Sequence, residues 1–279
     1  MTAFTTLIDA AELAALDPGS VRVFDCRFDL TDPGAGEARH AAAHIPGAAY
    51  LHLDRDLAGP VSPGRTGRHP LPDRDAFRAT LRAYGVAEDS QVVAYDDAGG
   101  MFAARCWWMV RWAGHARVAV LDGGFQAWQA LAAGTLHVDT PASRPAPPEP
   151  RPSIVTMATL RPRVADGTWT LLDARAPDRF DGTNETLDPR GGHIPGALNA
   201  PFADNLDADG RFADRASLRR RFDSLLAGRE EQRTVCYCGS GVTAAHNVLA
   251  MVHAGLPEPA LYAGSWSEWI TDPDNPVET

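Results

Sequence analysis

The sequence has few cysteines, no long apolar run and no excess of positive charge, and each shortage excludes a class of protein. Four cysteines in 279 residues (Cys26, Cys106, Cys236 and Cys238) are too few and too scattered for a disulfide scaffold. The Cys-x-Cys at 236–238 lacks a second pair at zinc-site spacing, so we expect no structural zinc and no other metal. A net charge of −10 argues against nucleic acids and anionic membranes as partners.

Signals for export or membrane insertion are also missing. The N-terminus carries Asp9 and Glu12 and no basic segment, so it is not typical of a signal peptide. The most apolar stretch, residues 101–121, is interrupted by Arg105 and Arg111, and no run approaches the roughly 18 apolar residues of a membrane span. We therefore expect a reduced, cytoplasmic protein.

The sequence does contain one set of motifs twice. The repeated pairs are Val23–Arg27 with Leu171–Arg175, His44–Ala48 with His193–Ala197, Gln91–Asp96 with Thr234–Cys238, and Asp122–Trp128 with Ala263–Trp269. Four landmarks in the same order indicate a tandem duplication. The length fits two domains of ordinary size, and a hydrophobic content of 44% is sufficient for two cores.

A proline-rich segment separates the two copies. Residues 140–152 cannot form a helix or the interior of a sheet, because proline has no N–H donor and a fixed φ. We expect an extended linker over 139–152 that runs along the surface. The predicted domains are then an N-terminal copy over 1–138 and a C-terminal copy over 153–279.

Within a copy, runs typical of strands alternate with runs typical of helices. In the first copy the expected strands are Val21–Asp25, Gln91–Asp96 and Val118–Leu121, and the expected helices are Asp75–Tyr84, Phe102–Ala113 and Gly123–Ala132. This alternation implies right-handed βαβ units and an α/β fold, with a mostly parallel sheet and helices on both of its faces. In such sheets ligands bind beyond the carboxyl ends of the strands.

One stretch of the second copy joins a buried strand to a helix through a short loop. Thr234–Tyr237 are typical of the strand, and the apolar spacing after Thr243 indicates a helix that ends near Gly255. Cys238 and the three residues that follow it form the connection. This places Cys238 at the carboxyl end of a strand, where the fold binds ligands.

The loop after Cys238 favours a reactive thiol. Gly239 and Gly241 let successive N–H groups point inward as an anion-binding nest, and the helix N-terminus adds further donors. Such donors stabilise the thiolate, which is the nucleophilic form, so Cys238 is the candidate nucleophile. The alternative is a buried structural cysteine, which is common for this residue type.

Cys236 is expected to face the core as a small hydrophobic residue. A second possibility is that Cys236 resolves an oxidised Cys238. The sequence does not decide whether Cys106 or Cys236 has a redox role.

The segment Cys238-Gly-Ser-Gly-Val-Thr-Ala resembles the active-site loop of the rhodanese superfamily, and most of all that of its 3-mercaptopyruvate sulfurtransferase branch. Thiosulfate-specific members usually have a basic pair after the cysteine, where this chain has Gly239 and Ser240. The resemblance covers nearly the whole chain and implies two rhodanese-like domains, the second one catalytic. In the first copy Asp96 and Asp97 take the place of the cysteine. We therefore expect the first copy to be non-catalytic and to lend residues to the site.

Two arginines are candidates for binding the substrate. A guanidinium group binds a carboxylate through two parallel hydrogen bonds, and the resemblance implies that Arg179 and Arg190 hold the substrate carboxylate. The alternative is ordinary surface charge. The spacing between Arg179 and Arg190 is longer than in the family pattern, which puts Arg190 in question.

The histidines of the repeated His-Ile-Pro-Gly motif have two interpretations. Pro46 and Gly47 form a turn in the first copy, and the motif recurs around His193, which favours a structural role for both histidines. The resemblance instead implies a catalytic role for the histidine of the first copy, His44. An acidic residue before it is also implicated in the family, and Asp32 and Glu37 are the candidates here.

Other loop residues complete the expected site. The Ser240 hydroxyl can polarise a substrate oxygen or sulfur. The resemblance adds Gly239, Gly241, Val242 and Thr243 to the substrate-binding loop, although Thr243 fits the N-cap of the following helix better than a contact with the substrate.

The predicted reaction is a ping-pong sulfur transfer. The Cys238 thiolate attacks the sulfur of 3-mercaptopyruvate, a persulfide forms, and pyruvate leaves with proton transfer by His44 or Ser240. The persulfide then passes sulfur to a thiophilic acceptor such as cyanide, a thiol or a reduced thioredoxin, and no cofactor is needed.

Three alternatives remain open at this point. The first is a thiosulfate sulfurtransferase, which would differ only in its donor. The second is a cysteine phosphatase, although that loop requires an arginine where this chain has Ala244. The third is a non-enzymatic module that carries a persulfide or binds a partner protein.

Overall fold

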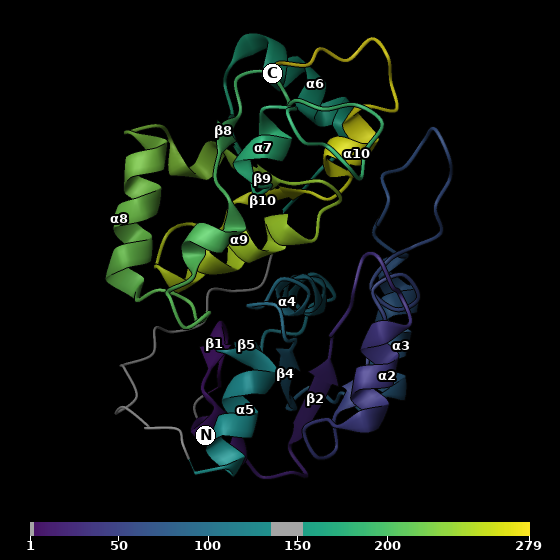
Figure 1. Ribbon diagram of the computed structural model, residues 1–279, viewed down its shortest axis with the longest axis vertical. Helices are drawn as coiled ribbons and strands as arrows, with labels where there is room; N and C mark the ends of the chain where they lie inside the picture. Colours follow the sequence, from purple (N-terminus) through teal and green to yellow (C-terminus); the bar gives the residue numbers. More distant parts are fainter. Residues whose placement is uncertain (1–2, 135–152) are drawn as a thin grey trace. The chain divides into compact units, whose positions relative to one another are not determined.

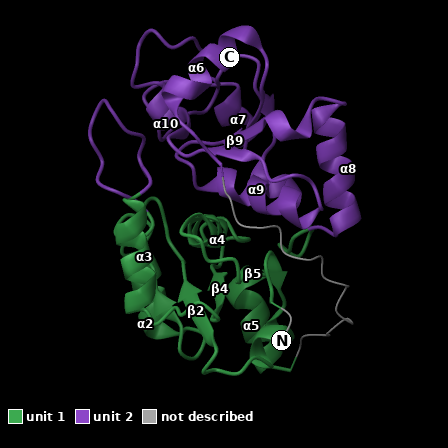
Figure 2. Ribbon diagram, turned by 180° about the vertical axis from the view of Figure 1, so that it is seen from behind, with its two compact units in different colours: residues 1–57, 72–151, 207–212 green, residues 58–71, 152–206, 213–279 purple. Residues whose placement is uncertain are grey.

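The computed structural model describes residues 3–134 and 153–279, which form two compact units (Figure 2). Unit 1 contains residues up to Leu57, the stretch that begins at Pro72, and the segment 207–212. Unit 2 contains the segment 58–71, residues from Ser153 to Leu206, and those from Ala213 onward. Each unit therefore includes a short segment from the half of the sequence that forms most of the other unit.

Unit 1 is a five-stranded parallel sheet with the strand order β1-β5-β4-β2-β3 (Figure 1). Its strands are β1 (Leu7–Ile8), β2 (Val21–Asp25), β3 (Ala49–Tyr50), β4 (Gln91–Tyr95) and β5 (Val118–Leu121), and its helices are α1 (Ala10–Ala14), α2 (Ala35–Ala42), α3 (Arg74–Ala83), α4 (Ala103–Trp112) and α5 (Gly124–Ala132).

Unit 2 repeats this topology with the order β6-β10-β9-β7-β8, again with parallel neighbours. Its strands are β6 (Ile154–Val155), β7 (Thr170–Asp173), β8 (Leu198–Asn199), β9 (Thr234–Tyr237) and β10 (Ala260–Tyr262). Its helices are α6 (Met157–Asp166), α7 (Pro177–Phe180), α8 (Arg215–Leu226), α9 (Thr243–His253) and α10 (Ser265–Trp269), with short 3-10 turns η1 (Phe202–Asn205) and η2 (Glu231–Arg233).

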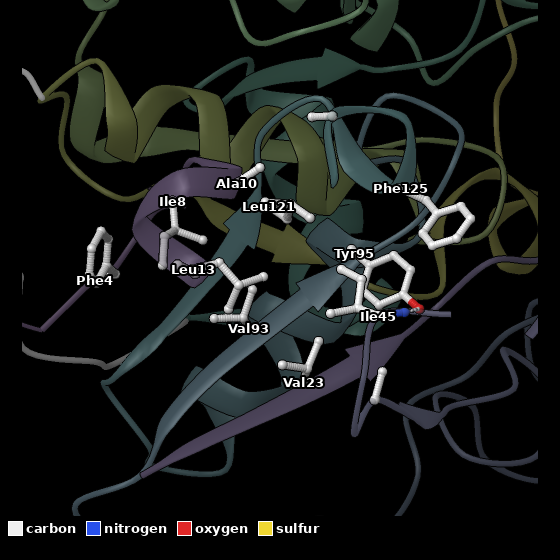
Figure 3. Packing of buried hydrophobic residues seen from close by; sticks show 13 residues of the cluster. Phe4, Ile8, Ala10, Leu13, Val23, Ile45, Val93, Tyr95, Leu121 and Phe125 are labelled. Atoms are coloured by element: carbon white, nitrogen blue, oxygen red, sulfur yellow. Dashed lines mark hydrogen bonds between the residues drawn. The ribbon is translucent and has the colours of Figure 1, made fainter. Parts of the chain in front are cut away.

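The central strands are apolar on both faces, as the sequence predicts for a parallel sheet. On one face of unit 1, Val23, Val93, Tyr95 and Leu121 pack with side chains of α1 and α5 in a single cluster (Figure 3). On the other face of the same strands, the side chains of Phe24, Val92, Ala94, Val118 and Val120 are also buried. The α/β fold with parallel sheets and helices is thus confirmed, and strands β2, β5 and β9 have the predicted bounds.

The predicted domain boundaries, 1–138, 139–152 and 153–279, stay a proposal, because the linker lies outside the described residues. The compact units differ from two contiguous halves of the sequence, because two short segments each belong to the unit formed mainly by the other half. Segment 207–212 joins unit 1, where Phe212 N donates to the Asp122 carboxylate (2.9 Å). Segment 58–71 joins unit 2 and carries two residues of the candidate site.

A buried ion pair at the end of β2 explains why two motifs recur together. In unit 1 the Arg27 guanidinium binds Asp25 (2.6 Å) and the Ala43 carbonyl (2.6 Å), directly before His44. The Tyr95 hydroxyl donates to Asp25 (2.7 Å). Burial alone would raise the pKa of Asp25, but the hydrogen bonds from Arg27 and Tyr95 outweigh it and hold this pKa below its ordinary value.

Unit 2 repeats the same arrangement at the end of β7. Arg175 binds Asp173 (2.6 Å) and the Gly192 carbonyl (2.7 Å), directly before His193. Both side chains are fully buried. The Asp-x-Arg motif therefore fastens the His-Ile-Pro-Gly turn to the central sheet in each copy, which is a structural reason for both repeats.

Candidate active site

Cys238 lies directly after β9, at the carboxyl end of the central strand of unit 2. It is 2% exposed, and the residues from Gly239 to Val242 are buried with it. The Gly241 N–H points at the Cys238 sulfur (N–Sγ 3.1 Å), and Gly241 has φ +79°, a left-handed conformation that favours glycine. An N–H that donates to sulfur stabilises negative charge there, as the nest interpretation requires.

The start of α10 fixes the backbone of Cys238. Ser265 Oγ accepts from Cys238 N (3.1 Å) and donates to the Tyr262 carbonyl (2.9 Å), and Trp266 N donates to the Cys238 carbonyl (2.9 Å). Ser265 has φ +56°, where unit 1 has Gly124 at φ +57°. A serine in the left-handed conformation is strained. A glycine would avoid the strain, but it has no hydroxyl to accept the hydrogen bond from Cys238 N.

In the equivalent loop of unit 1, backbone N–H groups bind an anion. Asp96 follows β4 as Cys238 follows β9, and its carboxylate accepts from the N–H groups of Ala98, Gly100, Phe102 and Ala103 at 2.8–2.9 Å. Burial raises the pKa of Asp96, and these four donors oppose that shift. The loop of the first copy therefore holds its own carboxylate in an anion cradle, and no thiol is present there.

Ser240 pairs with a histidine that the sequence analysis did not single out. His69 Nδ1 lies 2.7 Å from Ser240 Oγ, and both residues are buried. His69 belongs to segment 58–71, so it comes from the first half of the sequence but is part of unit 2. The residues between β3 and α3 form no helix or strand, and so long an irregular loop is a signal of function that could have drawn attention to His69.

His44 has a different environment in unit 1. It is exposed, stacks on His40 with ring centroids 4.1 Å apart, and its Nδ1 contacts the His40 carbonyl (2.8 Å). His193 repeats this contact with the Phe180 carbonyl (3.0 Å). The catalytic role of His44 stays a prediction, whereas the contact with Ser240 favours His69 for that role.

Arg179 lies beside the cysteine loop. A side chain added at Gly239 would place its Cβ 3.3 and 3.5 Å from Arg179 Nη2 and Nη1. Glu185 binds Arg179 through both carboxylate oxygens, at 2.9–3.1 Å. Burial alone would raise the pKa of Glu185, but the hydrogen bonds from Arg179 and from backbone N–H groups hold this pKa below its ordinary value.

Arg190 is exposed, and its backbone carbonyl accepts from the Trp266 indole (2.8 Å). A different arginine meets the loop with Arg179. The same added Cβ at Gly239 would lie 2.8 Å from Arg68 Nη2. Arg68 and Arg179 thus both lie beside Gly239, and the substrate-binding roles of Arg179 and Arg190 stay predictions.

The remaining predicted residues have more ordinary surroundings. Val242 is the N-cap of α9 without a side-chain hydrogen bond, and Thr243 is the first helical residue, so the predicted capping role of Thr243 was wrong. Glu37 pairs with Arg55 on the surface (3.0 Å), and the Asp32 carboxylate accepts from Gly34 N (3.2 Å).

The other cysteines are buried. Cys26, Cys106 and Cys236 are free thiols, and burial is the main reason that the pKa of Cys236 is raised. These surroundings favour the prediction that Cys236 is a core residue. Among the described residues, no cluster of three or more histidine, cysteine or acidic side chains is placed to hold a metal ion. Within the same residues, no helix is long and apolar enough to cross a membrane.

Comparison with known proteins gives matches over both halves of the chain. The family model for the rhodanese-like domain matches residues 9–131 and again 156–272. A probable 3-mercaptopyruvate sulfurtransferase of Pseudomonas aeruginosa is 49% identical over 98% of this chain and 98% of its own length. A putative thiosulfate sulfurtransferase of Mycobacterium tuberculosis is 39% identical over 97% of this chain and 96% of its own.

A solved structure agrees with these matches. The 3-mercaptopyruvate sulfurtransferase from Leishmania major superimposes with a TM-score of 0.79 and 31% identity, over 95% of this chain and 74% of that one.

Proposed function

The chain belongs to the rhodanese-like family and is a sulfurtransferase, and we propose that it takes sulfur from 3-mercaptopyruvate through a persulfide on Cys238. The observation that carries this proposal is the buried Cys238 loop, with an N–H on the sulfur and the Ser240–His69 pair beside it. The two residues after Cys238 are Gly239 and Ser240, and not the basic pair that is usual in thiosulfate-specific members. The relative with 49% identity carries the same donor in its name.

The first half-reaction forms an S–S bond and breaks the C–S bond of the donor. The Cys238 thiolate attacks the donor sulfur, and the electron pair of the broken bond leaves on carbon as pyruvate enolate. The Ser240 hydroxyl is our candidate proton donor to that enolate, and His69, hydrogen-bonded to it, can replace the proton (2.7 Å). No oxidant or reductant is consumed.

The second half-reaction returns the enzyme to its starting state. A nucleophilic acceptor attacks the outer sulfur of the persulfide, and Cys238 leaves as a thiolate. Because Cys238 N and O are both held by α10, the sulfur keeps its place beside Gly241 N in both steps. Cyanide would accept sulfur in an assay, and we propose a thiol or a reduced thioredoxin-type protein as the acceptor in the cytoplasm.

The test compares initial rates with 3-mercaptopyruvate and with thiosulfate, using cyanide as acceptor and Cys238→Ala as control. We expect a strong preference for 3-mercaptopyruvate that is lost in the variant. A preference for thiosulfate, the donor named in the relative with 39% identity, would keep Cys238 and refute the proposed donor. Turnover with neither donor would refute the proposed function in favour of a carrier module.

A further inference from the structure

Two guanidinium groups converge on the residue that follows Cys238. Measured from the Cβ that a side chain at Gly239 would have, Arg68 Nη2 is 2.8 Å away and Arg179 Nη2 is 3.3 Å away. Their side chains are 29% and 19% exposed, so both cations are accessible from solvent. A small anion that reaches Cys238 therefore meets Arg68 as well as Arg179.

The backbone around Arg68 is fixed independently of its side chain. Arg68 N donates to Ser267 Oγ (3.0 Å), and Gly67 packs so closely on the Gly264 carbonyl that no side chain would fit there. The next residue, His69, contacts Ser240. Because the segment is held at three successive positions, the direction of the Arg68 side chain toward Gly239 follows from the fold.

One carboxylate bridges the two arginines. Asp188 forms an ion pair with Arg68 through Oδ1 and with Arg179 through Oδ2 (3.3 Å), and its side chain is only 3% exposed. Both oxygens of a single carboxylate are thus shared between the two guanidinium groups. A carboxylate of the donor would require these same hydrogen-bond donors.

Glu185, the other carboxylate of the cluster, is held differently. It binds Arg179 with both oxygens, contacts Arg175 (3.4 Å), and accepts from the N–H groups of Leu187 and Asp188. With partners on several sides, Glu185 orients Arg179 and stays in place. Asp188 has a longer contact with Arg179, and it borders a pocket of about 240 Å³, which leaves it room to turn away.

The charges of this cluster disfavour binding of an anionic donor as long as the Asp188 carboxylate remains paired with the two arginines. Arg68 and Arg179 are neutralised by Glu185 and Asp188, so an added anion would bring an uncompensated negative charge into a largely buried site. Departure of the Asp188 carboxylate restores one positive charge and frees hydrogen-bond donors on both arginines.

We propose that Asp188, which forms ion pairs with Arg68 and Arg179, is an internal competitor of the donor's anionic group for these two side chains. The inference rests on the proposed role of Cys238 as nucleophile. It makes Asp188 a specificity-determining residue, because its negative charge sets how strongly the site attracts any anion.

A test that needs no sulfur transfer is the rate of Cys238 alkylation by iodoacetate, an anion, relative to iodoacetamide, its neutral analogue. Each reaction forms an S–C bond and releases iodide. Cys238→Ala supplies the blank for the other three cysteines. We expect Asp188→Asn to raise the ratio about tenfold, the effect of one charge-assisted hydrogen bond, and Arg68→Gln to lower it by a similar factor.

Matched variants make the outcome decisive. Asp181→Asn removes an exposed charge from the same loop and should leave the ratio unchanged. In the double variant Arg68→Gln/Asp188→Asn, the ratio of iodoacetate to iodoacetamide rates should rise less than in Asp188→Asn alone. The reason is that the double variant also lacks the Arg68 cation, which would otherwise attract the iodoacetate. If Asp188→Asn does not fold, Asp188→Ser makes the same charge change with a smaller side chain.

An unchanged or lower ratio in the Asp188 variants would overturn the proposal, as would an unchanged ratio in Arg68→Gln. In turnover, the expected result is a KM for 3-mercaptopyruvate about tenfold lower in Asp188→Asn. A wild-type protein that turns over neither donor would refute the proposed function, while the alkylation ratio would still decide whether Asp188 guards the anion site.

Discussion

Replacing Arg175 with methionine should destabilise the protein and also weaken donor binding, whereas the same replacement at Arg27 should only destabilise it. The two arginines occupy equivalent positions after β7 and β2. Both are buried, and each binds the aspartate two residues before it at 2.6 Å. Removing either guanidinium leaves a buried carboxylate without its cation, which costs about 3–5 kcal/mol of the free energy of unfolding.

The two variants should differ because only Arg175 is connected to the candidate site. Its Nη1 contacts Glu185 (3.4 Å), and Glu185 in turn holds Arg179 beside Gly239. Without Arg175, Glu185 loses one of its partners and Arg179 loses its fixed orientation. We expect the KM for 3-mercaptopyruvate to rise about tenfold in Arg175→Met, the effect of one weakened charge-assisted contact.

Urea unfolding followed by circular dichroism gives the stabilities, and initial rates per folded molecule give the KM values. Asp173→Asn and the double variant Asp173→Asn/Arg175→Met complete a cycle that isolates the pair energy. A loss below about 1 kcal/mol in both arginine variants would refute the argument from burial, since that is the range of exposed pairs. A KM in Arg27→Met that rises as much as in Arg175→Met would refute the connection through Glu185.

Two further predictions concern single side chains. Arg179→Ala should raise the KM for 3-mercaptopyruvate about 10–100-fold, by loss of one charge-assisted interaction, and an unchanged KM in steady-state assays would reject its role in donor binding. His253 has its pKa lowered to about 4, mainly by burial and secondarily by Arg215, so the folded state resists its protonation. The stability it contributes is complete above the unfolded pKa near 6.5 and is lost as pH falls toward 4, by about 2–3 kcal/mol. His253→Asn should flatten this part of the curve of unfolding free energy against pH, and a curve as steep as the wild type would contradict the assignment.

The parts of this protein that the sequence predicts well are those with a local pattern. The strand before Cys238 and the helix after it follow from β-branched residues and from apolar spacing, and they have the expected bounds. The tandem repeat was visible because its motifs are compact. The Asp-x-Arg partnership behind that repeat was not, because it depends on which side chains the sheet brings together.

The residues missed at the site come from a segment without periodicity. Arg68 and His69 lie among glycines and prolines in a long loop, and nothing local indicates that they fold against α10 and the loop after β9. The family pattern instead pointed to His44 and Arg190, which occupy the expected places in the sequence but are exposed. Motif position predicted the tight loop after Cys238, and it could not predict which distant side chains that loop would contact.

The membership of segment 58–71 in unit 2 limits how far the two copies of the duplicated sequence can diverge independently. In the loop after β4 of the first copy, Asp96 stands where the second copy has Cys238. Yet the same copy encodes Arg68 and His69, which unit 2 contains. A deletion of either half of the sequence would therefore separate Arg68 and His69 from Cys238, so the proposed function keeps the first copy under selection together with the second.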